Sequence, residues 1–111
     1  MDKQGVENKV VLVTGAARRI GAVIAERFHR RGCKVILHCH RSRSAAENLA
    51  SQLNQRKSGS AAVVQADLTD KLQLSDLAQR SLAAFKRLDF VINNEQWKLD
   101  YSTPSSIIIT S

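Results

Sequence analysis

Two glycines and two arginines stand close together in the run Thr14 to Gly21, which reads Thr-Gly-Ala-Ala-Arg-Arg-Ile-Gly. Gly15 permits a sharp turn, Gly21 permits close approach of backbone segments, and Arg19 takes the place of the usual middle glycine. Backbone N–H groups at a helix N-terminus, with its partial positive charge, favour phosphate. The run is therefore a candidate pyrophosphate site, although two such glycines also occur in ordinary turns between a strand and a helix.

A second polar segment, His38-Cys39-His40-Arg41-Ser42, follows about twenty residues later. NAD sites usually carry Asp or Glu here, which accepts hydrogen bonds from the ribose 2′-hydroxyl. This segment has neither. Arg41 can bind a 2′-phosphate through a charge-assisted fork, Ser42 can add an O–H donor, and Arg19 would face the same phosphate from the other side. The two segments together predict an NADP(H) site.

A metal cluster is the weaker alternative for this second segment. In a strand, His38 and His40 project from one face and Cys39 from the other, so the three side chains do not converge. We therefore expect no metal site. Cys33 and Cys39 form neither a disulfide framework nor a Cys-x-x-Cys pair, and we expect small, buried, reduced thiols.

The chain also has the pattern of a scaffold that would bring these segments together. Apolar runs predict strands at 9–14, 35–39, 61–66 and 90–92, with helical patterns between them. This alternation predicts an α/β fold, a Rossmann-type parallel sheet with helices on both faces and strand order 3-2-1-4. The ligand crevice would lie beyond the carboxyl ends of the first and fourth strands.

Each expected helix has an apolar face and a start or stop signal. The first ends at Gly32, and its apolar face holds Ile20, Val23, Ile24 and Phe28. The second begins at a capping box, Ser44 to Glu47, and its apolar face holds Ala46, Leu49, Ala50 and Leu53. The third, capped by Asp70, carries inward Leu74, Leu77, Ala78, Leu82 and Phe85.

Four segments, in order along the chain, resemble the short-chain dehydrogenase/reductase superfamily: Thr14 to Gly21, His38 to Ser42, Gln65 to Leu68, and Leu88 to Asn94. The arginine in the glycine turn and the His-x-His-Arg-Ser segment resemble the pteridine reductases, which are NADPH-dependent enzymes that reduce dihydropteridines and folates. The resemblance implies a pteridine or folate substrate and NADP(H) as cofactor.

The resemblance also implies roles for particular residues. Arg19, His40, Arg41 and Ser42 would surround the 2′-phosphate. Asp67 would accept from the adenine amino group with Leu68 beside the ring, and Asn94 would lie near the nicotinamide ribose. The expected cofactor-binding set is Gly15, Arg19, Ile20, Gly21, His40, Arg41, Ser42, Asp67, Leu68 and Asn94.

The chain departs from the family after Asn94, where Glu95-Gln96-Trp97 replace small residues and Glu95 would crowd the ribose. The family's Tyr-x-x-x-Lys pair is absent, because Ser105 stands four residues after the single tyrosine, Tyr101. Such one-domain folds run to about 250 residues. We therefore expect a truncated form, with a half-domain at 1–94, a non-family tail at 95–111 and no catalytic residue. Residues 107–109 could add a strand beside the fourth.

Charge and composition limit the class of partner. The net charge is +7, and residues 1–57 carry 12 Lys and Arg against 4 Asp and Glu, so an anionic partner should dock there. No apolar run is long enough for a membrane span and no signal sequence is evident, so we expect a cytoplasmic protein without a membrane partner. Nucleic-acid binding would explain the charge but not the motif order.

The leading hypothesis is an NADPH-dependent reductase of pteridine reductase type, present as a truncated form that is inactive alone. The alternative is a non-catalytic NADP(H)-binding module or a partner of a full-length subunit. A half-sheet would also leave apolar surface on its fourth strand and third helix, which would favour oligomer formation.

Overall fold

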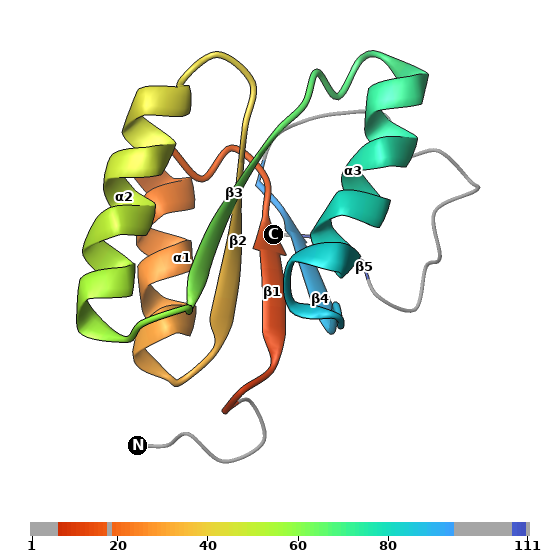
Figure 1. The fold of residues 1–111 in the computed structure, drawn as a ribbon. Coiled ribbons are helices and arrows are strands. Elements are labelled where there is room, and N and C mark those ends of the chain that lie inside the picture. Colours follow the sequence, from red (N-terminus) through yellow and green to blue (C-terminus); the bar gives the residue numbers. More distant parts are fainter. Residues whose placement is uncertain (1–6, 18, 95–107, 111) are drawn as a thin grey trace.

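A parallel five-stranded sheet forms the centre of the molecule in the computed structural model, which describes residues 7–17, 19–94 and 108–110 (Figure 1). The strand order is β3-β2-β1-β4-β5, which confirms the expected 3-2-1-4 order and α/β class. The strands are β1 (Val10–Val13), β2 (Lys34–Cys39), β3 (Ala61–Gln65), β4 (Phe90–Asn93) and β5 (Ile108–Thr110). The helices are α1 (Arg19–Arg30), α2 (Arg43–Arg56) and α3 (Lys71–Phe85).

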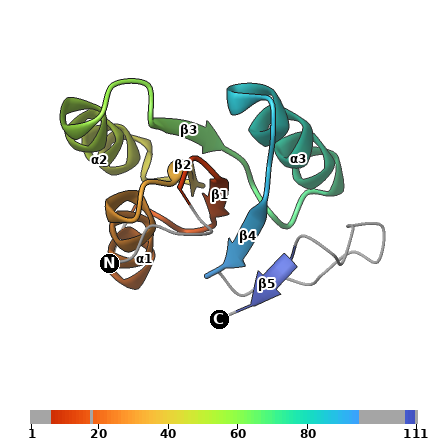
Figure 2. The ribbon, with the colours of Figure 1, turned by 90° about the horizontal axis from the view of Figure 1, so that it is seen from below.

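Helices cover both faces of the sheet: α1 and α2 lie on one face and α3 on the other (Figure 2). Alternate residues of each strand point to opposite faces. Val11 and Val13 of β1 therefore enter the core under α1 and α2, and Val10 and Leu12 enter the core under α3. All four β1 residues are buried, as expected for a continuous apolar run in a parallel sheet.

Helix α1 ends as predicted, but its predicted inner face is only partly right. Gly32 has φ 95°. Its N–H donates to the carbonyl oxygen of His29, and the N–H of Cys33 donates to the carbonyl oxygen of Phe28, which is a Schellman ending. The buried residues are Gly21, Ala25 and His29. Of the expected face, Ile24 and Phe28 are half-buried and pack on the core, whereas Ile20 and Val23 are 67% and 52% exposed. Small Gly21 and Ala25 let the helix lie close to the sheet, which turns those two side chains outward.

The second helix confirms the predicted face but corrects the predicted start. Its buried residues are Ala46, Leu49, Ala50 and Leu53, as expected. The N-cap is Ser42 rather than Ser44, and Ser42 makes no side-chain capping bond. Glu47 accepts a hydrogen bond from Arg43 Nε at 2.8 Å, one helical turn away, so there is no capping box at 44–47.

Helix α3 confirms the predicted cap, because Asp70 Oδ1 accepts from Leu72 N at 2.9 Å. The predicted inner face is only partly right. Leu77 and Ser81 are buried and Leu74 and Phe85 are half-buried. Ala78 and Leu82 are exposed, because the helix contacts the sheet along one narrower stripe and these two residues lie on its flank.

Strand β5 pairs with β4 in parallel, with Ile108 opposite Val91 and Ile109 opposite Ile92. This confirms that the isoleucine run adds to the fourth strand. Ile107, and with it the expectations about Glu95, Tyr101 and Ser105, lies outside the described residues. Among the described helices, none has the length and apolar character needed to cross a bilayer.

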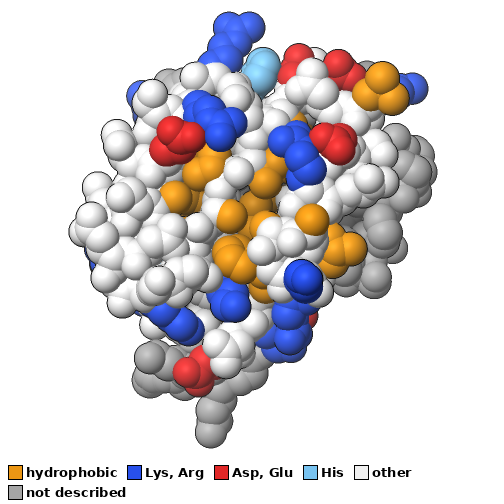
Figure 3. Space-filling view, viewed as in Figure 1, with side chains coloured by type: hydrophobic (Ala, Val, Ile, Leu, Met, Phe, Trp, Pro, Cys, Tyr) orange, Lys and Arg blue, Asp and Glu red, His pale blue; other side chains and the backbone are white. Residues whose placement is uncertain are grey.

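The other edge of the sheet is β3, where Ala61, Ala62 and Val63 are half-buried. Figure 3 shows apolar side chains gathered in the hollow between α2 and α3, with Lys and Arg side chains along both sides. Of the three histidines, His29 and His38 are buried and His40 is exposed.

Candidate functional site

A pocket of about 470 Å³ lies beyond the carboxyl ends of β1, β2 and β4. Three chain segments line it, and they come from the turn after β1, the end of β2 and the residue after β4. The lining residues are Gly15, Ala17, Arg19, Ile20, Cys39, His40, Arg41, Ser42 and Asn94. Seven of the ten predicted cofactor residues therefore meet at one pocket, and the other three, Gly21, Asp67 and Leu68, are not among its lining residues.

Arg19 and Arg41 line the same pocket from different elements, and both side chains are exposed. No Asp or Glu occurs among the described residues that line it. Two guanidinium groups with no lining carboxylate favour an anionic ligand. Arg19 also has φ 50°, in the left-handed region that costs about 1–2 kcal/mol for a non-glycine residue. Arg19 thus has a backbone conformation typical of glycine and adds a positive charge to the pocket.

The turn after β1 is held against β4 and α1. Gly15 has φ 61°, and its carbonyl oxygen accepts from Asn94 Nδ2 at 3.3 Å. The N–H of Asn94 donates to Thr14 Oγ1 at 2.9 Å. Gly21 lies behind this contact rather than in the pocket, because a Cβ there would meet Gly15 O at 2.1 Å. The side-chain amide of Asn94 therefore holds the turn in place, and the same residue lines the pocket.

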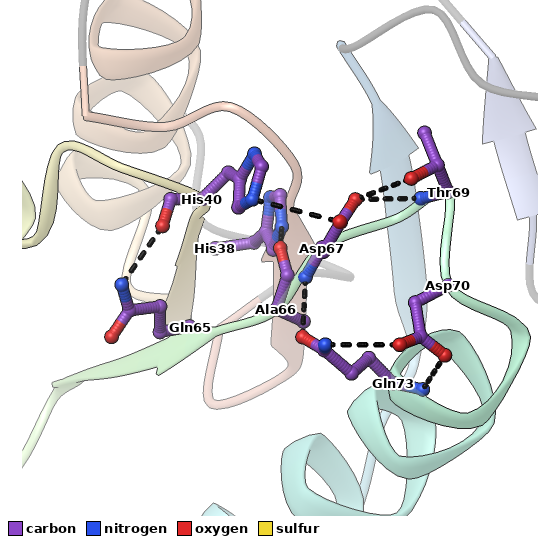
Figure 4. A network of polar contacts seen from close by, with 8 residues as sticks. All are labelled: His38, His40, Gln65, Ala66, Asp67, Thr69, Asp70 and Gln73. Atoms are coloured by element: carbon purple, nitrogen blue, oxygen red, sulfur yellow. Dashed lines mark hydrogen bonds and ion pairs between the residues drawn. The ribbon is translucent and has the colours of Figure 1, made fainter.

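Asp67 lies next to the pocket rather than in its lining. Its Oδ1 accepts from the N–H of Thr69 at 3.0 Å and from the Thr69 hydroxyl at 2.7 Å (Figure 4). These hydrogen bonds hold the pKa of Asp67 below its usual value. Its Oδ2 lies 3.8 Å from Nε2 of His40, which does line the pocket. Leu68 is half-buried and packs on the core under α3.

Two glutamines that sequence reasoning left without a role position this region (Figure 4). Gln65 Nε2 donates to the carbonyl oxygen of His40 at 2.8 Å, and Gln73 Oε1 accepts from the N–H of Asp67 at 2.8 Å. Gln73 Nε2 also donates to Asp70 at 3.2 Å. The Gln65 bond links residues 25 positions apart, so no local pattern in the sequence signals it. Gln73 stands three residues after the N-cap Asp70, which is the spacing of a capping box and could have been recognised.

His38, one of the three residues of the metal alternative, has another role in the structure. The side chain is fully buried. Nδ1 accepts from the N–H of Gly15 at 3.0 Å, and Nε2 lies 2.9 Å from the carbonyl oxygen of Ala66. Both ring nitrogens thus face backbone groups. Cys39 is buried, and burial raises the pKa of its thiol.

Comparison with known proteins finds a matching family and several relatives. The family model described as short chain dehydrogenase matches residues 9–97. Pteridine reductase 1 of Leishmania tarentolae is 54% identical over 61 residues, which is 55% of this chain and 21% of that protein. Versicolorin reductase stcU of Emericella nidulans is 38% identical over 94 residues, or 84% of this chain and 35% of that protein.

A third relative, the fatty acyl-CoA reductase of Acinetobacter baylyi, is 35% identical over 92 residues, which is 83% of this chain and 30% of that protein. The chain thus spans between about a fifth and about a third of the length of these curated relatives. The matched region contains every residue described at the pocket.

Proposed function

This chain belongs to the short chain dehydrogenase family, and on that premise we propose that its pocket binds NADP(H). The family uses a nicotinamide dinucleotide, and the proposal concerns which one. The observation that carries it is the shared position of Arg19 and Arg41 on one pocket, beside the hydroxyl of Ser42. A 2′-phosphate satisfies these cations, whereas the ribose 2′-hydroxyl of NAD(H) leaves them unpaired.

The surrounding residues support the same ligand. His40 and Ser42 add polar groups beside Arg41, and Gly15 and Ile20 border the space toward the start of α1. The N-terminus of α1 carries partial positive charge, which suits the pyrophosphate. Asp67, ionised and held beside His40, offers an acceptor for the adenine amino group.

We propose a reductase of pteridine or dihydrofolate type for the whole protein, from the pteridine reductase similarity and the His-x-His-Arg-Ser segment. Bound NADPH would supply the hydride. The 111 residues contain one tyrosine, Tyr101, followed four residues later by Ser105, and so hold no Tyr-x-x-x-Lys pair. We therefore expect this chain by itself to bind NADPH without reducing substrate.

A second candidate for these 111 residues is a non-catalytic NADP(H)-binding module that acts alone or with a full-length subunit. Both candidates predict the same pocket and no turnover by this chain alone, and they differ in whether the chain changes the rate of a full-length reductase. Adding dihydrobiopterin and NADPH to the chain, alone and with a full-length family reductase, separates them. A change in the reductase rate only in the mixture supports the partner role.

Calorimetric titration with NADPH and NADH tests the cofactor assignment itself. NADPH should bind at least about tenfold more tightly, because one charge-assisted phosphate contact has about that effect. Equal affinities, or no binding of either dinucleotide, would overturn the proposal.

A further inference from the structure

His38 contacts both halves of the candidate site from a position that is itself outside the pocket. It belongs to β2, and its imidazole lies between the turn after β1 and the segment after β3. Figure 4 shows the ring against the carbonyl of Ala66, directly before Asp67. On the other side Nδ1 is 3.0 Å from the nitrogen of Gly15, which lines the pocket.

The two contacts determine the tautomer. The Gly15 N–H can only donate, so Nδ1 must carry no proton, and the Ala66 carbonyl can only accept, so Nε2 must carry one. A protonated ring or the other tautomer breaks the Gly15 bond. The geometry therefore requires a neutral imidazole with its hydrogen on Nε2.

The same residue also holds the next part of the turn through its backbone. The N–H of Ala16 donates to the carbonyl oxygen of His38 at 2.9 Å. The N–H groups of both Gly15 and Ala16 are thus directed at His38, away from a phosphate in the pocket. The donors for a pyrophosphate must come from the start of α1, and their position depends on how the turn is fixed.

We propose that His38 is a positioning residue for the dinucleotide: its ring holds the glycine turn and the segment before Asp67 at a set spacing. This inference rests on the proposed function, since the spacing matters only if one ligand spans both parts. The bond to Gly15 should matter most, because Gly15 lines the pocket and Ala66 does not.

Two substitutions separate the two bonds. In His38→Asn, the side-chain oxygen is as many bonds from Cα as Nδ1, so it can still accept from Gly15. In His38→Gln, the amide nitrogen is as many bonds from Cα as Nε2, so it can still donate to Ala66. Each variant keeps one bond and loses the other, and both remain polar in the same buried place.

We expect His38→Asn to bind NADPH within about threefold of the unchanged chain and His38→Gln to bind at least about tenfold more weakly, at equal melting temperatures. Equal affinities for the two variants would overturn the positioning role. If the unchanged chain fails to bind NADPH, the proposed function fails instead.

A cofactor-free measurement keeps the inference testable in that case, or if a variant unfolds. Nitrogen-15 NMR of the unchanged chain should show His38 unprotonated at Nδ1 and protonated at Nε2, and the Gly15 amide should exchange slowly. The opposite tautomer, or fast exchange at Gly15, would overturn it. Exchange at Gly15 should accelerate in His38→Gln and not in His38→Asn.

Discussion

A Cβ atom on Gly21 would lie 2.1 Å from the carbonyl oxygen of Gly15, so α1 and the turn after β1 meet backbone to backbone. The same Cβ would lie 2.7 Å from Asn94 Nδ2, the group that donates to Gly15. Three segments that border the pocket are thus packed at one point with no room for a side chain. This contact makes the turn rigid and explains why the smallest residue stands at the inner face of the helix.

Gly21→Ala should therefore destabilise the fold and distort the pocket together. We expect a loss of about 2–3 kcal/mol in the free energy of unfolding, the scale of overpacking in a rigid site. NADPH affinity should fall as well, because the turn must move. Urea unfolding followed by NADPH titration checks both effects. Val23→Ala, on the exposed face of the same helix, is the control and should change stability by less than about 0.5 kcal/mol.

The strand order and two helix ends could be predicted from sequence, because their signals are local or repeat along the chain. Apolar runs separated by helical patterns leave few topologies for a parallel sheet. Gly32 and Asp70 act on their own helix ends. Hydrophobicity predicts only part of the α1 face: Ile24 and Phe28 do pack on the core. Gly21 and Ala25 are buried for their small size and His29 for its bond to Ser60, which hydrophobicity does not predict.

The candidate pocket was predictable in part for a related reason. Charged residues and glycines at the ends of predicted strands can be recognised in the sequence, and Arg19 and Arg41 do meet at one pocket. His38 and Gln65 could not be recognised in the sequence, because their partners are backbone groups that only the folded sheet brings near. A buried strand histidine gives no sign in sequence of whether it packs, ligates or positions a turn.

Arg41→Ala should weaken NADPH binding far more than NADH binding. Removing one guanidinium from a phosphate contact lowers affinity by about tenfold to a hundredfold, and NADH lacks that phosphate. Calorimetric titration of both cofactors measures the difference. Arg30→Ala is the matched control, since Arg30 is exposed and is not among the residues lining the pocket. Similar losses for both cofactors would refute the 2′-phosphate role of Arg41.

Arg19→Gly should weaken NADPH binding without lowering the stability of the fold. Arg19 has φ 50°, so glycine relieves about 1–2 kcal/mol of backbone strain while losing about 0.5–1 kcal/mol through the freer unfolded chain. Stability should stay unchanged or rise slightly, while NADPH affinity falls about tenfold or more with the lost cation. Lys86→Gly is the control, because Lys86 has φ 64° at the end of α3 and is not among the pocket residues. It should gain stability with no change in NADPH affinity. A clear loss of stability in Arg19→Gly would contradict the backbone strain assigned to Arg19.

The stability of the fold should rise with pH across the range in which His29 titrates. Burial, followed by the charges of Arg56 and Lys57, lowers the pKa of His29 below its usual 6.5. Below 6.5 the unfolded chain therefore binds a proton that the folded chain does not, so acid favours unfolding until the lowered pKa is passed. The urea midpoint should increase from about pH 5 to about pH 7.

The variant His29→Gln is the control for this prediction. His29 Nε2 lies 2.7 Å from Ser60 Oγ, and His29→Gln can keep that contact without a titrating group. The variant should lose the part of the slope that His29 causes. Identical slopes would show that His29 does not cause the pH dependence.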